Sequence, residues 1–176
     1  MDYKTKPASR ELLRQLSSVF RELFGFGEGG RFPVMEALEK FPEVFANSFF
    51  RIVEDGELPI TVPAKCNVLN GGGFEILIKQ LVYDGALKGV GAYRDHIVHE
   101  MCHAFLYSIG FTPVMNRSFS KGVLPNYCSS EWQAKALCGE VMMPYEETYD
   151  MYPEEIEEKY GVSKAQAQYR MKYKGE

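Results

Sequence analysis

The sequence contains no apolar run that approaches the roughly 18–20 residues of a membrane span. Its opening stretch, MDYKTKPASRELLRQL, lacks the apolar segment and the cleavage-like site of a secretory signal. Basic residues are not in surplus either, because 20 Lys and Arg stand against 24 Asp and Glu, for a net charge of −4. We therefore expect a cytoplasmic protein that binds neither a membrane nor nucleic acid directly.

Cysteine is also scarce, and none of the four cysteines forms a CxxC pair. We expect Cys66, Cys102, Cys128 and Cys138 to be reduced thiols that are mostly buried. By contrast, apolar residues make up 45% of the 176 residues and aromatic residues 14%, which is enough to build a packed core. A chain of this length suits a single domain.

The hydrophobic pattern predicts helices at both ends and short strands between them. Helices are expected at 9–24, 34–40, 43–50, 92–109 and 129–142, with two small helices within 153–174. Strand-like runs lie at 51–53, 60–62 and 74–79. This order predicts an α+β fold, a small sheet with helices around it. We expect one domain over 1–176, in which 1–30 form an N-terminal helix and loop and 146–176 a helical tail.

All three histidines of the chain, His96, His99 and His103, lie within eight positions. On a helix, His99 and His103 are about 40° apart around the axis and about 6 Å apart along it. Two imidazoles in that relation can bind one tetrahedral ion, for which zinc is the usual choice. Glu100 follows the first histidine, where its carboxylate can reach a metal-bound water without binding the metal. The sequence therefore predicts a hydrolytic zinc site with Glu100 as the general base.

A catalytic zinc site usually has a third protein ligand, and helical geometry alone leaves its identity open. The candidates after the motif are Glu131, Glu140, Glu146, Glu147 and the nearby cysteines. Glu131 and Glu140 are nine residues apart on one predicted helix, which places them on opposite faces. Only one of these two can therefore point at the metal.

Two segments together resemble the ImmA/IrrE family of metallopeptidases. The first is the HEMCH motif at 99–103, and the second is EWQAKALCGEVMMP at 131–144, which begins 28 residues after the last histidine. The resemblance implies a compact zincin-like domain in which Glu131 is the third zinc ligand and Glu100 the base. It also implies that the strand around 74–79 shapes a groove for an extended peptide.

The resemblance further implies a function: a regulatory zinc metalloendopeptidase that cuts a separate protein. That protein is often a helix-turn-helix repressor of a mobile element or stress circuit. The main alternative is a non-catalytic, metal-binding regulator or antitoxin-like partner, although an intact Glu100 argues against it. A further alternative is a metal-assisted hydrolase of another bond, such as a deacylase.

Five other residues near the motifs carry weaker hypotheses. His96 lies on the same side of its helix as His99 and could contact substrate, although partial exposure without a role is the simpler interpretation. Cys102 and Cys138 are more simply buried thiols than inhibitory metal ligands. Tyr127 and Tyr145 could each stabilise an oxyanion, but neither is favoured in a chain with 11 tyrosines.

Overall fold

The computed structural model describes residues 2–114 and 124–173, and within them it contains eight α-helices, one short 3₁₀ helix and a three-stranded sheet. The strands are β1 (Phe49–Val53), β2 (Ala64–Val68) and β3 (Phe74–Lys79). The helices are α1 (Arg10–Leu23), α2 (Val34–Val44), α3 (Gln80–Leu87), α4 (Gly91–Ser108), η1 (Asn126–Cys128), α5 (Ser130–Met142), α6 (Tyr145–Thr148), α7 (Pro153–Tyr160) and α8 (Lys164–Lys172). The predicted α+β class is confirmed.

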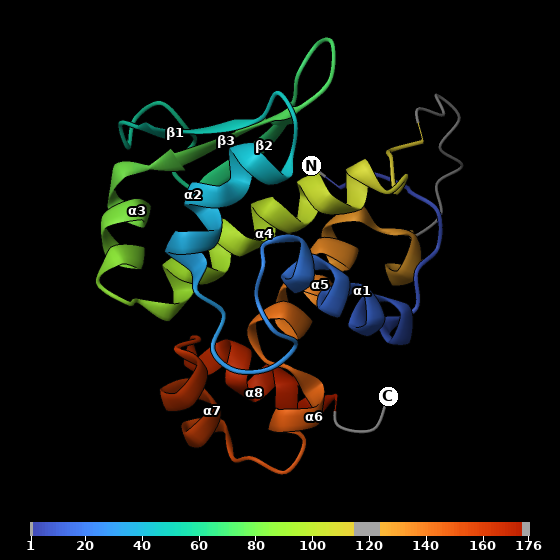
Figure 1. Ribbon diagram of the computed structural model, residues 1–176, viewed down its shortest axis with the longest axis vertical. Helices are drawn as coiled ribbons and strands as arrows, with labels where there is room; N and C mark the ends of the chain where they lie inside the picture. Colours follow the sequence, from blue (N-terminus) through green and yellow to red (C-terminus); the bar gives the residue numbers. More distant parts are fainter. Residues whose placement is uncertain (1, 115–123, 174–176) are drawn as a thin grey trace.

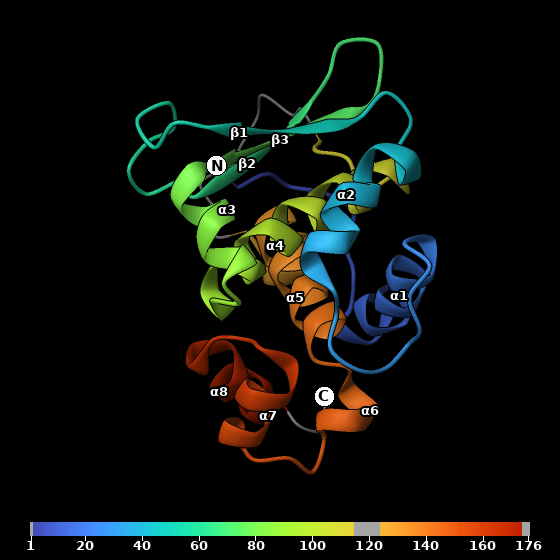
Figure 2. The same ribbon diagram turned by 60° about the vertical axis from the view of Figure 1, so that its left-hand side comes forward.

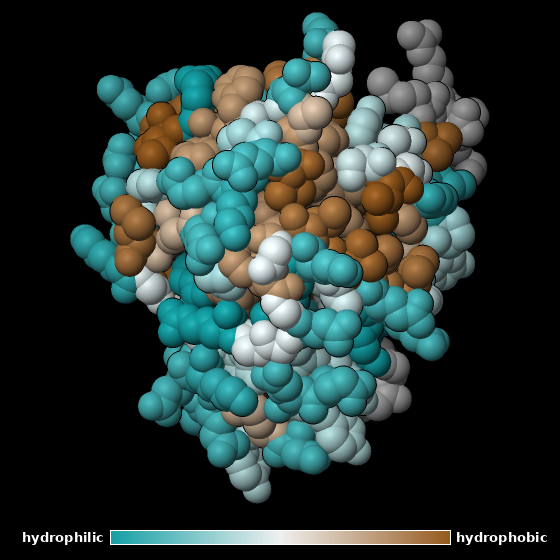
Figure 3. Space-filling model, in the orientation of Figure 1, coloured by the Kyte–Doolittle hydropathy of each residue, from teal (hydrophilic) through white to brown (hydrophobic). Residues whose placement is uncertain are grey.

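The elements form layers, with the sheet above, α4 and α5 in the middle, and α6–α8 below (Figures 1 and 2). Helix α4 contacts both β2 and β3 and packs against α5, and α5 in turn packs against α1. Apolar side chains gather over the upper part of the face in Figure 3, whereas the lower part, formed by α6–α8, is hydrophilic. Helix α4, which carries the three histidines, is therefore the central helix of the molecule.

The strand order is β1-β3-β2, with β1 parallel and β2 antiparallel to the central strand β3. The prediction of a strand at 74–79 is confirmed, and β1 begins two residues before the predicted run at 51–53. The predicted strand at 60–62 is wrong, because Ile60 lies in a turn and is 96% exposed. The chain turns there, with Val62 N–H donating to Pro59 C=O, and pairs with β3 only from Pro63 onward.

The longer helices lie where the sequence predicts them. Helix α1 begins after Ser9, whose hydroxyl accepts a hydrogen bond from Leu12 N–H, and α5 begins after Ser129, which caps Trp132 N–H in the same way. The tail contains the two expected helices, and Ser163 caps α8 by accepting from Gln166 N–H. The last three residues of the predicted tail, 174–176, lie outside the described residues.

The helix predicted at 34–40 is confirmed, but the predicted break at Pro42 and the second helix at 43–50 are wrong. One helix, α2, runs through Pro42, and residues from 49 onward belong to β1. The proline ring faces solvent near the end of α2, and the Phe45 N–H still donates to Phe41 C=O. Burial of Phe41 on the inner face of this last turn offsets the local cost of the proline. Helix α3 directly follows β3 and was not predicted.

One continuous core connects the N-terminal helices with the sheet and α4. Aromatic rings form an unbroken series through it, with neighbouring centroids 5.0–6.1 Å apart. In spatial order the series is Phe26, Phe32, Phe20, Phe24, Phe45, Phe74 and Tyr107. Among residues 2–114 and 124–173, no helix has the length and apolar character that a bilayer crossing requires.

Candidate metal centre and its cleft

His99 and His103 lie one turn apart on α4 and face the same side. Their Nε2 atoms are 3.1 Å apart, and their rings are nearly perpendicular, with an interplanar angle of 89°. The opposite side of α4 is fixed in the core, since Ile97, Val98 and Met101 are fully buried. Burial of that apolar face determines the rotation of the helix and therefore turns both imidazoles outward.

Glu131 lies in the first turn of α5, the helix that packs against α4. Its Oε2 is 3.3 Å from His99 Nε2, and its Oε1 is 3.5 Å from His103 Nε2. Hydrogen bonds with His103 and His99 hold the pKa of this carboxyl well below its usual range. Burial lowers the pKa of His103, but the hydrogen bond to Glu131 and the charge of Glu100 outweigh burial and raise it.

These three side chains fit a divalent metal ion. They form the one group of three or more metal-ligating residues found among residues 2–114 and 124–173, and their ligand atoms all lie within 4.8 Å of one another. A tetrahedral zinc ion with ligands at about 2.0–2.1 Å separates its donor atoms by about 3.3–3.4 Å. The two imidazole nitrogens are 3.1 Å apart, and each lies 3.3 or 3.5 Å from a different oxygen of the Glu131 carboxylate, so these separations are close to that value. Two imidazole nitrogens and one carboxylate are also a donor set that zinc accepts.

The other candidate third ligands are turned away from the histidines. Glu140 points to the opposite face of α5, as its spacing predicted, and is paired in a buried site with Arg170. Glu147 accepts hydrogen bonds from Gly30 N–H and the Tyr160 hydroxyl. Glu146 is exposed on α6. Of these four carboxylates, Glu131 is the one that groups with both histidines among the residues that the structure describes.

Glu100 is held by the sheet rather than by its own helix. Its Oε2 accepts a hydrogen bond of 2.8 Å from the backbone N–H of Cys66 in β2. Burial raises the pKa of the Glu100 carboxyl, although the charges of His99 and His103 oppose this shift. The carboxylate therefore lies beside the two imidazoles with one oxygen engaged by a strand.

The backbone of β2 faces this site with its outer edge. In an antiparallel pair, alternate residues bond the neighbouring strand, and the residues between them point their N–H and C=O groups away. Pro63 C=O accepts from Lys79 N–H of β3, so Ala64, Cys66 and Val68 direct their backbone groups outward. The hydrogen bond from Cys66 to Glu100 agrees with this register.

A cleft of about 940 Å³ runs between β2 and α4 and contains His99, His103, Glu100 and Glu131. The strand at 74–79, which the family resemblance placed at the groove, contributes Phe74 to the lining, but the edge that borders the cleft belongs to β2, and β3 is the central strand. The reason is that the residues at 64–68 pair on the outer side of β3.

Other residues reach the cleft, and some expected ones do not. His96 lines the cleft, as do Tyr3 and Tyr107. Tyr107 follows His103 by one turn, so its position on the same helix face could have been read from the sequence, but Tyr3 gave no such signal. Tyr127 lines a separate hollow and Tyr145 stacks on Arg14, so neither hydroxyl borders the cleft. Cys102 and Cys138 are buried free thiols, as expected.

Comparison with known families agrees with the geometry. The sequence pattern of the IrrE N-terminal-like domain, a family of peptidases, matches residues 70–172, well over half of the chain. The chain belongs to this family. The resemblance drawn from two motifs is thereby confirmed, and the match spans β3 and α3–α8 of this IrrE-like fold. Helices α1 and α2 and strands β1 and β2 lie before the match. No curated protein matches the chain.

Proposed function

We propose that the protein is a zinc-dependent endopeptidase, in which His99, His103 and Glu131 hold the metal and Glu100 is the general base. The observation that carries this proposal is the convergence of two imidazole nitrogens and one carboxylate, with ligand atoms within 4.8 Å of one another, beside a second carboxylate that is fixed by a strand edge. When bound, zinc would lower the pKa of a coordinated water from about 15.7 toward about 7.

Glu100 is suited to accept a proton and pass it on. Its Oε2 is anchored on Cys66 N–H, which leaves Oε1 to take a proton from the water and deliver it to the leaving amine. Burial raises the pKa of this carboxyl, which brings it closer to neutral pH, where a base exchanges protons most effectively. The anchoring hydrogen bond also keeps the carboxylate from turning into the ligand group.

The cleft favours an extended polypeptide as substrate. The outward N–H and C=O groups of Ala64 and Val68, together with Cys66 C=O, offer a strand edge to which a peptide backbone can pair. Main-chain pairing of this kind favours a peptide bond over the small acyl group that a deacylase would take. We propose a separate protein as the natural substrate, with a helix-turn-helix repressor as the candidate that the family resemblance implies.

The test combines metal analysis with peptide cleavage. Wild type, Glu100→Gln and Glu131→Ala would be analysed for zinc content and incubated with unstructured peptides of known sequence, with products read by mass spectrometry. We expect about one zinc in wild type and in Glu100→Gln, and a sharp loss in Glu131→Ala. Cleavage should fall by about 10²–10⁴-fold in Glu100→Gln.

Two outcomes would overturn the proposal in different ways. A wild type that takes up no zinc when zinc is supplied would remove the metal centre altogether. A zinc-loaded wild type that cleaves the peptides no faster than Glu100→Gln would instead favour the metal-binding regulator.

A further inference from the structure

Residues 2–8 lie along η1 and the start of α5, and they precede the part of the chain that matches the family. Thr5 N–H donates to Cys128 C=O at 2.9 Å, and Ser130 N–H donates to Tyr3 C=O at 2.9 Å. Lys4 and Ser129 form an isolated antiparallel bridge. The segment is thus joined by its backbone to the residues that immediately precede Glu131.

The carboxylate of Asp2 closes the first turn of α5. Its Oδ2 accepts from the Ser129 hydroxyl at 2.7 Å, and its Oδ1 accepts from the Ser130 hydroxyl at 3.3 Å. The same Oδ1 accepts from the backbone N–H of Glu131 at 3.2 Å. A negative charge at the N-terminus of a helix also stabilises the helix through its dipole. Three successive residues of the turn that presents Glu131 are therefore bonded to one side chain.

Glu131 needs such support, because its own side chain is 44% exposed and is not packed into the core. The direction of its carboxylate depends on where the first turn of α5 places its backbone. Ser129 caps this turn through Trp132 N–H, and Asp2 in turn accepts from the hydroxyl of Ser129. Asp2 thus acts both on the cap and on the backbone of the ligand residue.

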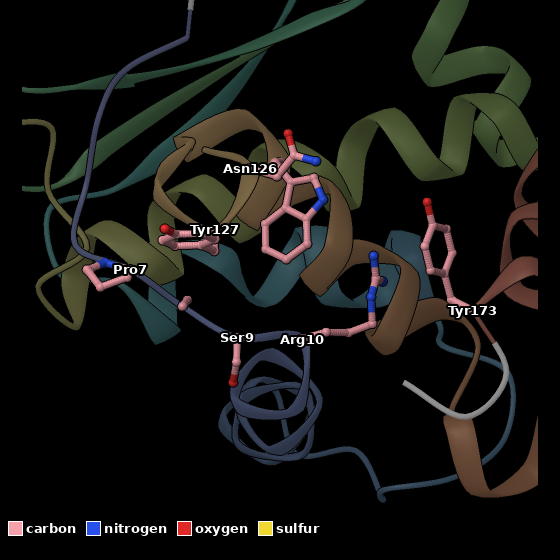
Figure 4. Close-up of a pocket in the computed structure, with 8 residues that line it drawn as sticks. Pro7, Ser9, Arg10, Asn126, Tyr127 and Tyr173 are labelled. Carbon is pink, nitrogen blue, oxygen red and sulfur yellow. The ribbon is translucent and has the colours of Figure 1, made fainter. Parts of the chain in front are cut away.

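The segment is fixed firmly enough to hold Asp2 in place. The side chain of Gln133, fully buried in α5, donates from Nε2 to Lys6 C=O and to Tyr127 C=O, both at 2.8 Å. Figure 4 shows the continuation of the segment, with Pro7 near Tyr127 and the Arg10 side chain reaching toward Tyr173. The hollow that these side chains line has a volume of about 520 Å³ and shares no lining residue with the metal cleft.

We propose that Asp2 is a positioning residue of the metal centre, which fixes the first turn of α5 and thereby the approach of Glu131 to His99 and His103. This inference rests on the proposed metal site and extends it to a segment outside the family match. Partners that orient a metal ligand typically change metal affinity by about 10–100-fold when they are removed.

The experiment is a zinc titration against a competing chelator on wild type, Asp2→Ala, Asp2→Asn and Asp55→Ala. Asp55 is a matched control, because its Oδ1 accepts from Leu81 N–H in the first turn of α3 at the same 3.2 Å. We expect Asp2→Ala to bind zinc about 10–100-fold more weakly. Asp2→Asn should fall between, since its amide oxygen can still accept from Glu131 N–H. Asp55→Ala should match wild type.

Thermal unfolding without metal separates positioning from general destabilisation. Asp55→Ala loses one hydrogen bond at the start of a helix and Asp2→Ala loses three, so we expect both to melt at or below the temperature of wild type, but only Asp2→Ala to bind zinc more weakly. Unchanged zinc affinity in Asp2→Ala, beside a wild type that binds one zinc and a Glu131→Ala that does not, would overturn the role of Asp2 alone. A wild type that binds no zinc would overturn the metal centre and this inference together.

Discussion

Replacing Glu140 by alanine should destabilise the fold without removing the metal, although Glu140 shares a helix with Glu131. The Glu140 side chain is 1% exposed, and its two oxygens each lie 3.0 Å from a guanidinium nitrogen of Arg170, whose side chain is 3% exposed. Arg14 approaches from α1 at 3.4 Å. This carboxylate therefore joins α5 to both α1 and α8, on the face opposite the cleft.

The magnitude follows from burial. Removing one partner of a buried, hydrogen-bonded ion pair leaves an uncompensated charge and typically costs about 3–5 kcal/mol. For a chain of this length, 1 kcal/mol corresponds to a shift in melting temperature of about 2–4 °C, so the expected loss is about 6–20 °C. Glu36→Ala is the control, because it breaks an exposed pair with Lys40 at 3.3 Å that should contribute at most about 0.5 kcal/mol.

The assay is thermal unfolding of the metal-free proteins, followed by zinc analysis at a temperature where both variants are folded. Zinc stoichiometry should equal that of wild type in Glu140→Ala and in Glu36→Ala. A Glu140→Ala protein no less stable than Glu36→Ala would refute the reasoning from the buried pair. Loss of zinc at unchanged stability would show that Glu140, rather than Glu131, faces the metal.

Three further changes should have separable effects. Zinc binding should weaken as the pH falls, because protons compete with zinc for His103, and the raised pKa of His103 makes this begin at a higher pH than at an ordinary histidine with a pKa near 6.5. Chelator-buffered titrations across about pH 5–8 would check this prediction, and a constant affinity would contradict it. Gly91→Ala should cost about 1–3 kcal/mol, since its Cβ would meet the backbone of Val162; denaturant unfolding measures the loss, and wild-type stability would contradict the close packing. Lys79→Met should raise KM for cleaved peptides while zinc content is unchanged. The reason is that Lys79 Nζ donates to Pro59 C=O at 2.8 Å and so holds the loop 57–63, which lines the cleft. An unchanged KM would show that this loop does not bind substrate.

The two helices that carry the candidate site could be predicted from the sequence because their signals are local. An apolar face on α4 and serine caps before α1 and α5 depend on residues within one or two turns. The placement of Glu131 beside the histidines depends instead on how α4 and α5 pack. The family resemblance supplied it at the sequence level, and the three-dimensional structure agrees with it.

The sheet was less predictable because its strands are defined by distant partners. The sequence at 64–68, AKCNV, has little intrinsic strand preference, yet it pairs with β3 on one side and receives Glu100 on the other. The β-branched run at 60–62 looked more like a strand, but it lies between two prolines and turns instead. The hydrogen bond that anchors the candidate base therefore comes from a strand that local patterns did not indicate.

The series of aromatic rings also has a practical consequence for how the protein can be divided. It begins at Phe26 and ends at Tyr107 beside the cleft, and its members come from both sides of residue 70, where the family match begins. A fragment expressed from residue 70 onward would lose the phenylalanines that contact Phe74 and Phe105, as well as β2 itself. Its exposed apolar surface would favour aggregation over folding. The shortest fragment that folds should therefore include the segment that supplies these rings, well before residue 70, where the family match begins.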